Sequence, residues 1–183
     1  MPMPNPRAAG FSLLELMVTV AIAAILLSLG LPSFQSTLRS NRVVTATNEI
    51  IASLALARTE AIRSTRSAGV CPSTTGTACD GTSWNEGWMV WADQGNTGWG
   101  DFAAGDTVLR YSSQRPGVTI NADDVGNDDI EKFTFDARGR LSSGTTAATI
   151  HLSSESCPEG QALLRTLTIG VTGQVRAERG NCS

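Results

Sequence analysis

Few side chains in this sequence are of types that do chemistry, and their spacing excludes the common enzyme classes. The one histidine, His151, lies in the alternating segment TIHL, and there is no G-x-S-x-G nucleophile motif or phosphate-binding glycine loop. A catalytic triad requires a nucleophile, a base and an acid that orients the base. We therefore interpret His151 as a structural or surface residue, and we expect no catalytic residue, no enzyme activity and no cofactor.

The cysteines could hold a zinc ion or form disulfides. They are Cys71, Cys79, Cys157 and Cys182. Structural zinc sites usually contain pairs of cysteines about two to four residues apart, and this sequence has no C-x-x-C. An even number of cysteines in an exported domain is typical of disulfides, so no metal is expected. The segment PSTTGTA between Cys71 and Cys79 is short and contains glycine, which favours that pair and leaves Cys157 for Cys182.

The segment DQGNTGWGD contains oxygen-bearing side chains of the type that bind calcium, at Asp93, Asn96 and Asp101. Its spacing differs from that of an EF-hand loop, and the closing glutamate is missing. A glycine-rich hairpin is the simpler interpretation, and calcium binding is the alternative.

The strongest functional signal is a carboxylate inside a long apolar run. From Phe11 to Leu31 the sequence is almost wholly apolar and contains one acid, Glu15. About 20 helical residues span the ~30 Å hydrocarbon core, so we expect a transmembrane helix over 11–31. A cleavable secretory signal has a shorter apolar core. A plain anchor does not explain an acid whose insertion costs roughly 2.5–3.5 kcal/mol at the membrane centre, although a glutamate reaching back to the headgroups is an alternative.

The rest of the sequence divides into a basic helix and an acidic, β-rich head, which predicts an α+β fold. Residues 35–66 carry five arginines against two glutamates, and apolar residues recur three and four apart, which predicts an amphipathic helix to Arg66. From Ser67 onward, seven arginines and one lysine face fourteen acids. Short alternating segments and turns around Gly139 and Gly173 predict antiparallel strands. The expected strands are 69–71, 87–92, 107–112, 118–121, 130–136, 147–152, 163–171 and 174–177.

The segment GFSLLELMVTVAIAAIL, residues 10–26, resembles the class III signal of type IV pilins and pseudopilins. The resemblance implies that a prepilin peptidase cuts between Gly10 and Phe11 and then methylates the new amine of Phe11. It also implies that Glu15 pairs with the terminal amine of a neighbouring subunit, which at 4 Å and an effective dielectric near 20 gains roughly 4 kcal/mol. Pro32 stands where this family often bends its helix.

Several later segments resemble the GspH/FimT branch of that family, including EIIASLALARTEAIRS, EGWMVWADQGNTG and FTFDARGRLSSG. This branch contains H-class pseudopilins of type II secretion and FimT/FimU-type minor pilins. The implied fold is pilin-like, with a long N-terminal helix packed on an antiparallel sheet. The implied parts are a leader (1–10), a transmembrane segment (11–31), an amphipathic half-helix (32–66) and a periplasmic head (67–183).

The same resemblance implies a structural subunit of a type IV pilus or a type II secretion pseudopilus, near the filament tip. The chain would cross the bacterial inner membrane once, with its N-terminus in the cytoplasm and its head in the periplasm. The implied partners are other pilins or pseudopilins, the prepilin peptidase, the inner-membrane assembly platform and membrane lipid.

DNA capture is the alternative function. Some FimT-type members resemble DNA-uptake receptors with a Gly-Arg-x-Arg motif near the C-terminus, but here Gln174 follows Gly173. The arginines that could bind DNA are Arg138, Arg140, Arg176 and Arg179. The acidic head and the broken motif favour the structural subunit, with these arginines at strand edges where they discourage edge pairing.

Overall fold

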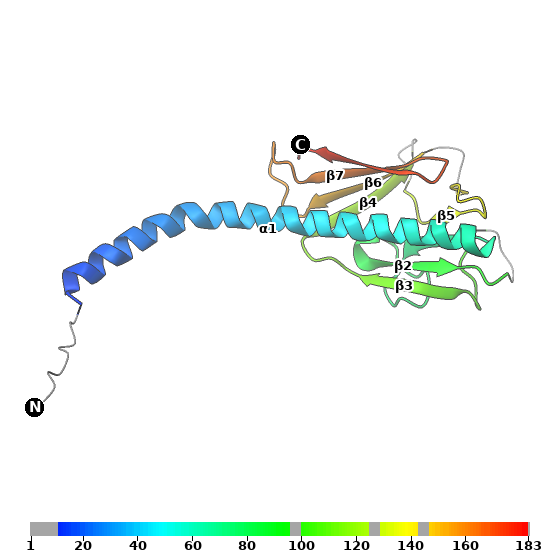
Figure 1. The fold of residues 1–183 in the computed structure, drawn as a ribbon, viewed down its shortest axis with the longest axis horizontal. Helices are drawn as coiled ribbons and strands as arrows, with labels where there is room; N and C mark the ends of the chain where they lie inside the picture. The colour runs from blue at the N-terminus through cyan, green and yellow to red at the C-terminus, as the bar shows by residue number, and fades with distance from the viewer. Residues whose placement is uncertain (1–10, 96–99, 125–128, 143–146, 183) are drawn as a thin grey trace, which may run out of the picture. The chain divides into compact units, whose positions relative to one another are not determined.

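The computed structural model describes residues 11–95, 100–124, 129–142 and 147–182. The chain forms two compact units, residues 1–38 and 39–183, and the helix α1 (Leu13–Ser64) begins in the first and ends in the second (Figure 1). In the first unit, the stretch 13–31 of α1 is apolar apart from Glu15, Thr19, Ser28 and Gly30, so apolar residues occur on every side of the helix. An 18-residue window of α1 has a mean hydropathy of 2.3, and none of it is buried, so α1 is long and apolar enough to cross a membrane.

In the second unit, α1 carries the expected apolar stripe. The buried residues of this stripe are Val43, Ala46, Thr47, Ile50, Leu54, Ala57 and Ala61. Because alanine side chains are small, the sheets can approach the backbone of the helix closely at these positions. The helix ends at Ser64, two residues before the expected end, because Thr65 adopts a left-handed conformation with φ of 55° that terminates helical hydrogen bonding.

The strands form two four-stranded antiparallel sheets, whereas we expected one. The first has the order β3-β2-β1-β5 and the second the order β4-β6-β7-β8 (Figure 1). The strands are β1 (Ala68–Pro72), β2 (Gly87–Ala92), β3 (Thr107–Ser113), β4 (Val118–Asp124), β5 (Phe133–Phe135), β6 (Ala148–Ser154), β7 (Leu164–Ile169) and β8 (Val175–Gly180). Each of these lies within or beside an expected strand, and the β7–β8 hairpin turns at Gly173 as expected.

The strand β5 is shorter than the expected 130–136, and the expectation was wrong at both ends. The Ile130 N–H donates a hydrogen bond to the Ala122 carbonyl of β4 at 2.8 Å, which draws the chain before β5 to the other sheet. After β5, Asp136 begins a tight turn instead of continuing the strand, because its carboxylate accepts hydrogen bonds from the N–H groups of Arg138 and Arg140.

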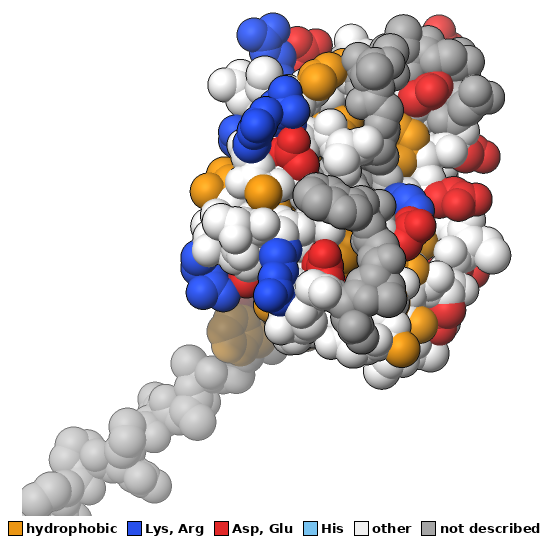
Figure 2. Space-filling model, turned by 90° about the vertical axis from the view of Figure 1, so that its right-hand side faces the viewer, with side chains coloured by type: hydrophobic (Ala, Val, Ile, Leu, Met, Phe, Trp, Pro, Cys, Tyr) orange, Lys and Arg blue, Asp and Glu red, His pale blue; other side chains and the backbone are white. Residues whose placement is uncertain are grey.

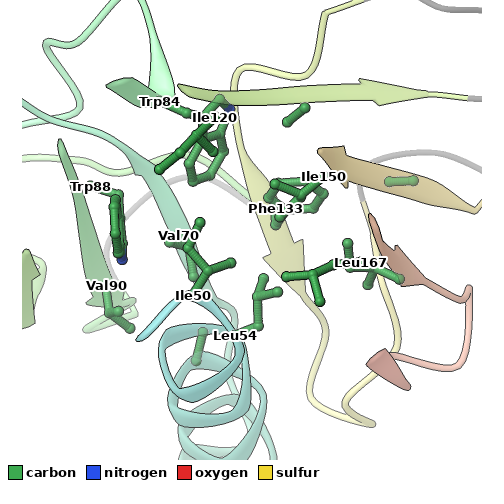
Figure 3. Packing of buried hydrophobic residues seen from close by; sticks show 14 of the residues in the cluster. Ile50, Leu54, Val70, Trp84, Trp88, Val90, Ile120, Phe133, Ile150 and Leu167 are labelled. Carbon is green, nitrogen blue, oxygen red and sulfur yellow. The ribbon is translucent and has the colours of Figure 1, made fainter. Parts of the chain in front are cut away.

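The main core lies where α1 and both sheets meet (Figure 3). The residues labelled there are Ile50, Leu54, Val70, Trp84, Trp88, Val90, Ile120, Phe133, Ile150 and Leu167. Trp88 is fully buried against α1, and its indole Nε1–H donates to the Ser53 hydroxyl at 3.0 Å. Full burial of a large apolar side chain contributes about 1.5–3 kcal/mol, so this cluster holds helix and sheets together.

Candidate functional site

The expected assembly residues lie at the beginning of α1. Gly10, at the expected cleavage point, lies outside the described residues. Phe11 is 84% exposed, and Glu15 is an exposed acid in the first turn of the helix, where the helix dipole favours negative charge. Within the part of the chain that the structure describes, no cation lies within ion-pair distance of Glu15. Among the described residues, its carboxylate therefore has no ionic partner.

The helix α1 is continuous through Pro32. Proline removes one backbone hydrogen bond and commonly bends a helix. A bend at Pro32 stays a prediction.

Two disulfides tie the β-rich head, in the pairing expected from the sequence. Cys71 is joined to Cys79 with a Cα–Cα distance of 5.6 Å, and Cys157 is joined to Cys182 with a Cα–Cα distance of 5.5 Å. The first closes a loop beside β1, and the second holds the C-terminal tail against the segment before β7. The described residues contain no group of three or more histidines, cysteines or acids able to hold a metal.

The loop closed by Cys71 and Cys79 is ordered by one carboxylate. Asp80 accepts hydrogen bonds from the Thr74 backbone N–H at 2.8 Å and from the hydroxyls of Ser73, Thr74 and Thr75. The Thr74 N–H, with help from these hydroxyls and against some desolvation, holds the pKa of Asp80 well below its usual range. The loop is therefore a rigid surface feature at neutral pH.

Calcium binding was the alternative for the segment 93–101, and its two described carboxylates have contacts within the protein. Asp93 accepts a hydrogen bond from the Gly95 N–H at 2.6 Å, and Asp101 forms an ion pair with Lys132. Asn96 lies outside the described residues. These contacts account for both described carboxylates without a metal ion. His151 also has a local contact, since its Nδ1 lies 3.2 Å from the Thr166 hydroxyl on the neighbouring strand.

The arginines considered as DNA contacts in the alternative function are divided between the turns around Gly139 and Gly173 and the far end of β8. Arg138 and Arg140 lie in the turn after β5, and Arg140 pairs with Asp136 at 3.2 Å. Arg176 is near the β7–β8 turn, whereas Arg179 is toward the other end of β8. Figure 2 shows the face that lies at the right of Figure 1. Acidic side chains lie between the basic ones at the left of this view, and mostly acidic side chains lie at its right. This arrangement does not favour binding of a polyanion.

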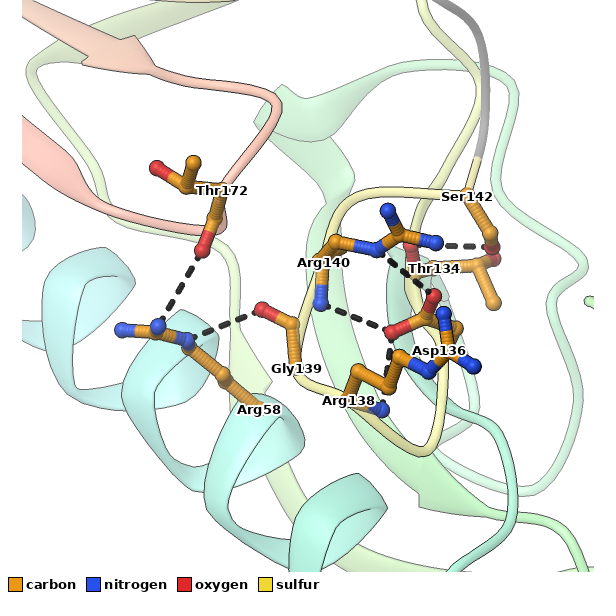
Figure 4. Close-up of polar contacts among 8 residues, drawn as sticks. All are labelled: Arg58, Thr134, Asp136, Arg138, Gly139, Arg140, Ser142 and Thr172. Atoms are coloured by element: carbon orange, nitrogen blue, oxygen red, sulfur yellow. Dashed lines mark hydrogen bonds and ion pairs between the residues drawn. The ribbon is translucent and has the colours of Figure 1, made fainter.

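The expected turns around Gly139 and Gly173 lie against each other, and Arg58 of α1 joins them (Figure 4). Arg58 Nε donates to the Gly139 carbonyl at 2.9 Å, and Nη2 donates to the Thr172 carbonyl at 3.1 Å. A Cβ atom on Gly173 would lie 2.1 Å from the Gly139 carbonyl oxygen, so only glycine fits. Sequence reasoning missed this role of Arg58, because nothing local indicates which carbonyls an arginine will reach.

Sequence reasoning also missed Arg165, a buried arginine on β7. A signal was present: in the alternating segment LLRTLTI, Arg165 occupies the same phase as Leu163, Leu167 and Ile169. That phase turns its side chain to the covered face of the sheet.

A long N-terminal helix, apolar in its first part and packed on antiparallel sheets in its second, defines the class of pilin-like subunits. Residues 46–173 match the family of the type II transport protein GspH, and residues 5–31 match the prokaryotic N-terminal methylation motif. Because the first match covers more than half of the chain, the chain belongs to the GspH family. It is a minor pilin or pseudopilin, and this family of membrane-anchored structural subunits assembles with other pilins.

Solved structures share this fold. The type IV minor pilin FimU of Pseudomonas aeruginosa is 25% identical over 75% of this chain and 89% of that chain, with a TM-score of 0.54. The minor pseudopilin EpsH from the type II secretion system of Vibrio cholerae is 13% identical over 79% of this chain and 99% of that chain, with a TM-score of 0.53. The second likeness shows the fold alone. No curated protein sequence matches the chain.

Proposed function

We propose that this chain is a structural subunit that enters a type IV pilus or a type II secretion pseudopilus near its tip. Residues 11–31 cross the bacterial inner membrane once, with the N-terminus in the cytoplasm and the β-rich head in the periplasm. A prepilin peptidase cuts between Gly10 and Phe11 and methylates Phe11. An inner-membrane platform then moves the subunit from the lipid into the filament, and the subunit carries out no catalysis.

The observation that carries this proposal is the exposed carboxylate of Glu15, which has no ionic partner among the described residues and lies on a largely apolar helix surface. The neighbouring Leu14 and Leu16 are 73% and 60% exposed, so this helix surface is open to lipid or to other helices. A carboxylate in that position is costly in lipid, by roughly 2.5–3.5 kcal/mol at the membrane centre and less near the interface. The cost supports a role for Glu15 that is fulfilled only when a partner is present.

Cleavage before Phe11 would create such a partner, a cationic amine four residues from Glu15 on every processed subunit. An amine of one subunit and the carboxylate of the next gain roughly 4 kcal/mol at 4 Å and an effective dielectric near 20. This gain offsets the insertion cost only when two helices are in register, which would make the pair a check on correct assembly.

Processing and assembly can be tested separately. Replacing Gly10 with phenylalanine should leave the full-length chain in the membrane, and mass spectrometry would show the uncut leader. Glu15→Ala should be cut and inserted normally but should be depleted from sheared filaments relative to its membrane pool. Glu15→Gln should fail nearly as badly, because the amide keeps the shape and loses the charge. An uncut wild-type chain, or normal filament entry of both Glu15 variants, would contradict the proposal.

Membership of a pilus or a secretion filament is a separate question that a deletion strain can answer. Loss of surface pili with normal export of secreted proteins would assign the chain to a type IV pilus. The reverse pattern would assign it to a type II secretion pseudopilus.

A further inference from the structure

The second sheet contains a buried cation without a counter-ion. Arg165 on β7 is 7% exposed, although it carries a full positive charge. Its Nη1 donates to the carbonyls of Ala162 at 3.0 Å and Leu164 at 2.8 Å. Among the described residues, no carboxylate lies within ion-pair distance of this guanidinium, and no acceptor contacts its Nε or Nη2. Nε and Nη2 are not among the buried polar atoms that lack a partner, so these two donors are open to the surface and can bind a group from outside the chain.

A second arginine lies beside it. Arg165 and Arg179 are directly paired in the register of β7 and β8, so their side chains emerge on the same face of the sheet. Burial, and then the charge of Arg179, lower the pKa of the Arg165 guanidinium. Two like charges this close repel each other, and a bound anion would relieve that repulsion.

A groove of about 290 Å³ opens onto these two arginines between α1 and β8. Val44, Thr47, Asn48 and Ile51 line it from α1, and Ala177 and Glu178 line it from β8. Glu178 forms no ion pair with either arginine among the described residues. Ala177 is paired with the fully buried Leu167 of β7, yet it is exposed, so the helix does not cover this face of β8. Figure 1 shows β8, in red, at the margin of the second sheet, and among the described strands β8 pairs with β7 alone.

We propose that this groove docks an aspartate or glutamate side chain of a neighbouring pilin subunit. The incoming carboxylate accepts hydrogen bonds from the free donors of Arg165 and from Arg179, and the residues next to it pack on Val44 and Ile51. Guanidinium binds carboxylate through two parallel hydrogen bonds, and exclusion of water by the docked subunit strengthens them. This inference rests on the proposed function, since it names a contact that the assembled filament would make.

A carboxylate side chain fits the surroundings better than a nucleic acid does. From Ser67 onward, fourteen acids outnumber eight basic residues, which repels a polyanion over several ångströms. The small groove admits one side chain and presents apolar side chains beside its two arginines and Glu178. Short-range pairing with a single carboxylate is therefore favoured over long-range attraction of a phosphate backbone.

Photocross-linking of the full chain in producing cells tests which molecule occupies the groove. A photoreactive phenylalanine analogue replaces Ala177, and the matched control replaces Arg176, which is also exposed but lies on the opposite face of β8 and does not line the groove. We expect adducts at position 177 with another pilin, at a peptide that contains an aspartate or glutamate, and far fewer adducts at position 176. Equal yields at the two positions, or adducts with lipid or DNA, would overturn the proposal.

Two charge variants test the energetic role of the groove. Arg179→Gln and Arg165→Met should each lower filament entry by about tenfold or more relative to the membrane pool, because loss of one partner of a desolvated charge pair speeds dissociation. Arg176→Gln is the matched control, since Arg176 lies on the outward face of β8, and it should enter normally. Arg179 is exposed and holds no described contact, so its variant stays informative even if Arg165→Met fails to fold.

The wild-type chain separates failure of this inference from failure of the proposed function. Normal filament entry of the wild type and of both groove variants would overturn the groove contact alone. Absence of the wild type from filaments would overturn the proposed function and this inference with it. A carboxylate found by cross-linking can be changed to arginine, and Arg179→Glu should then restore entry if the two groups meet.

Discussion

The two sheets of the second unit differ in how they use their outer faces. Both strands at the centre of the first sheet, β1 and β2, are buried at every position. In the second sheet, β6 alternates strictly between buried and half-buried positions. The inner faces of both sheets join the same core, so the difference lies entirely in what covers the outer faces.

A small second core covers the outer face of the first sheet. Cys71, Met89 and Trp91 are buried there, with Phe102 and Val108 packed against them. The loop from Ser73 to Asp80 lies over the same region, since the Tyr111 hydroxyl of β3 donates to the Thr74 carbonyl at 2.8 Å. The outward residues of β6 are instead Thr149, His151 and Ser153, which can face water. A disulfide and a polar loop thus allow a second apolar layer on one sheet only.

The largest expected change in stability comes from removing the central side chain of the second core. Trp91→Ala should lower the free energy of unfolding by about 3–5 kcal/mol, because it opens a cavity under the loop. Thr149→Ala, on the outer face of the second sheet, should change it by less than about 0.5 kcal/mol. Denaturant unfolding of the second unit measures both.

Trp91→Phe sharpens the same test. The Trp91 indole N–H is buried without a hydrogen-bond acceptor among the described residues. Phenylalanine removes that unsatisfied donor and keeps most of the packing, so it should cost much less than alanine. Equal losses for phenylalanine and alanine would mean that the indole's own shape, and not apolar burial, holds this layer.

The disulfides give the next effect in size. Loop entropy predicts about 3.5 kcal/mol for the bond Cys157–Cys182, whose partners are 25 residues apart, and about 2.5 kcal/mol for Cys71–Cys79, whose partners are 8 apart. Paired alanine variants of each bond, compared by unfolding midpoints, measure the difference. A larger loss on removing Cys71–Cys79 would indicate that this bond stabilises mainly by holding the second core in place.

The contact between turns from the two sheets gives a smaller effect. Gly173→Ala should destabilise the second unit by roughly 2 kcal/mol, because it strains a residue with φ of 74° and collides with the Gly139 carbonyl. Gly105→Ala is the matched control, since Gly105 has φ of 109° but no atom within 4 Å of the added Cβ. Equal losses would mean that backbone strain alone accounts for the effect.

The smallest effect concerns how stability depends on pH through Asp80, in the loop that lies over the first sheet. The pKa of Asp80 is lowered in the folded state, so its contribution is present above the unfolded pKa of about 3.9 and is lost as pH falls below that value. Asp80→Asn should lower the unfolding midpoint at neutral pH and leave a shallower decline toward acid pH. Unfolding curves at several pH values check this. An equal decline of the unfolding midpoint toward acid pH in both proteins would contradict it.

Local patterns in the sequence anticipated most elements of this fold. The period of three and four in 43–61 indicated the buried stripe of α1, and alternation in TIHL indicated β6. The continuous run GWMVWA, residues 87–92, indicated a strand, and runs of this kind are typical of strands buried on both faces. These patterns are local because each depends only on the geometry of one helix or strand.

The candidate site was anticipated unevenly for the same reason. The motif around Phe11 and Glu15 is a contiguous stretch of sequence, so its residues could be named without a structure. The roles of Arg58 and Arg165 depend on carbonyls and neighbours that other elements supply, and no local pattern gives a side chain's distant partners.

The sequence by itself therefore determined the apolar first part of α1, the carboxylate within it, the amphipathic second part and nearly all of the strands. Only the tertiary structure decided that the strands divide into two sheets, that β5 stops at Phe135, and that the buried Arg165 lies beside Arg179. The physical reason is that the choice of neighbouring strands depends on which faces of the sheets must be buried against each other and against the helix. That balance involves residues far apart in the chain, whereas periodicity and turn chemistry act within a few residues.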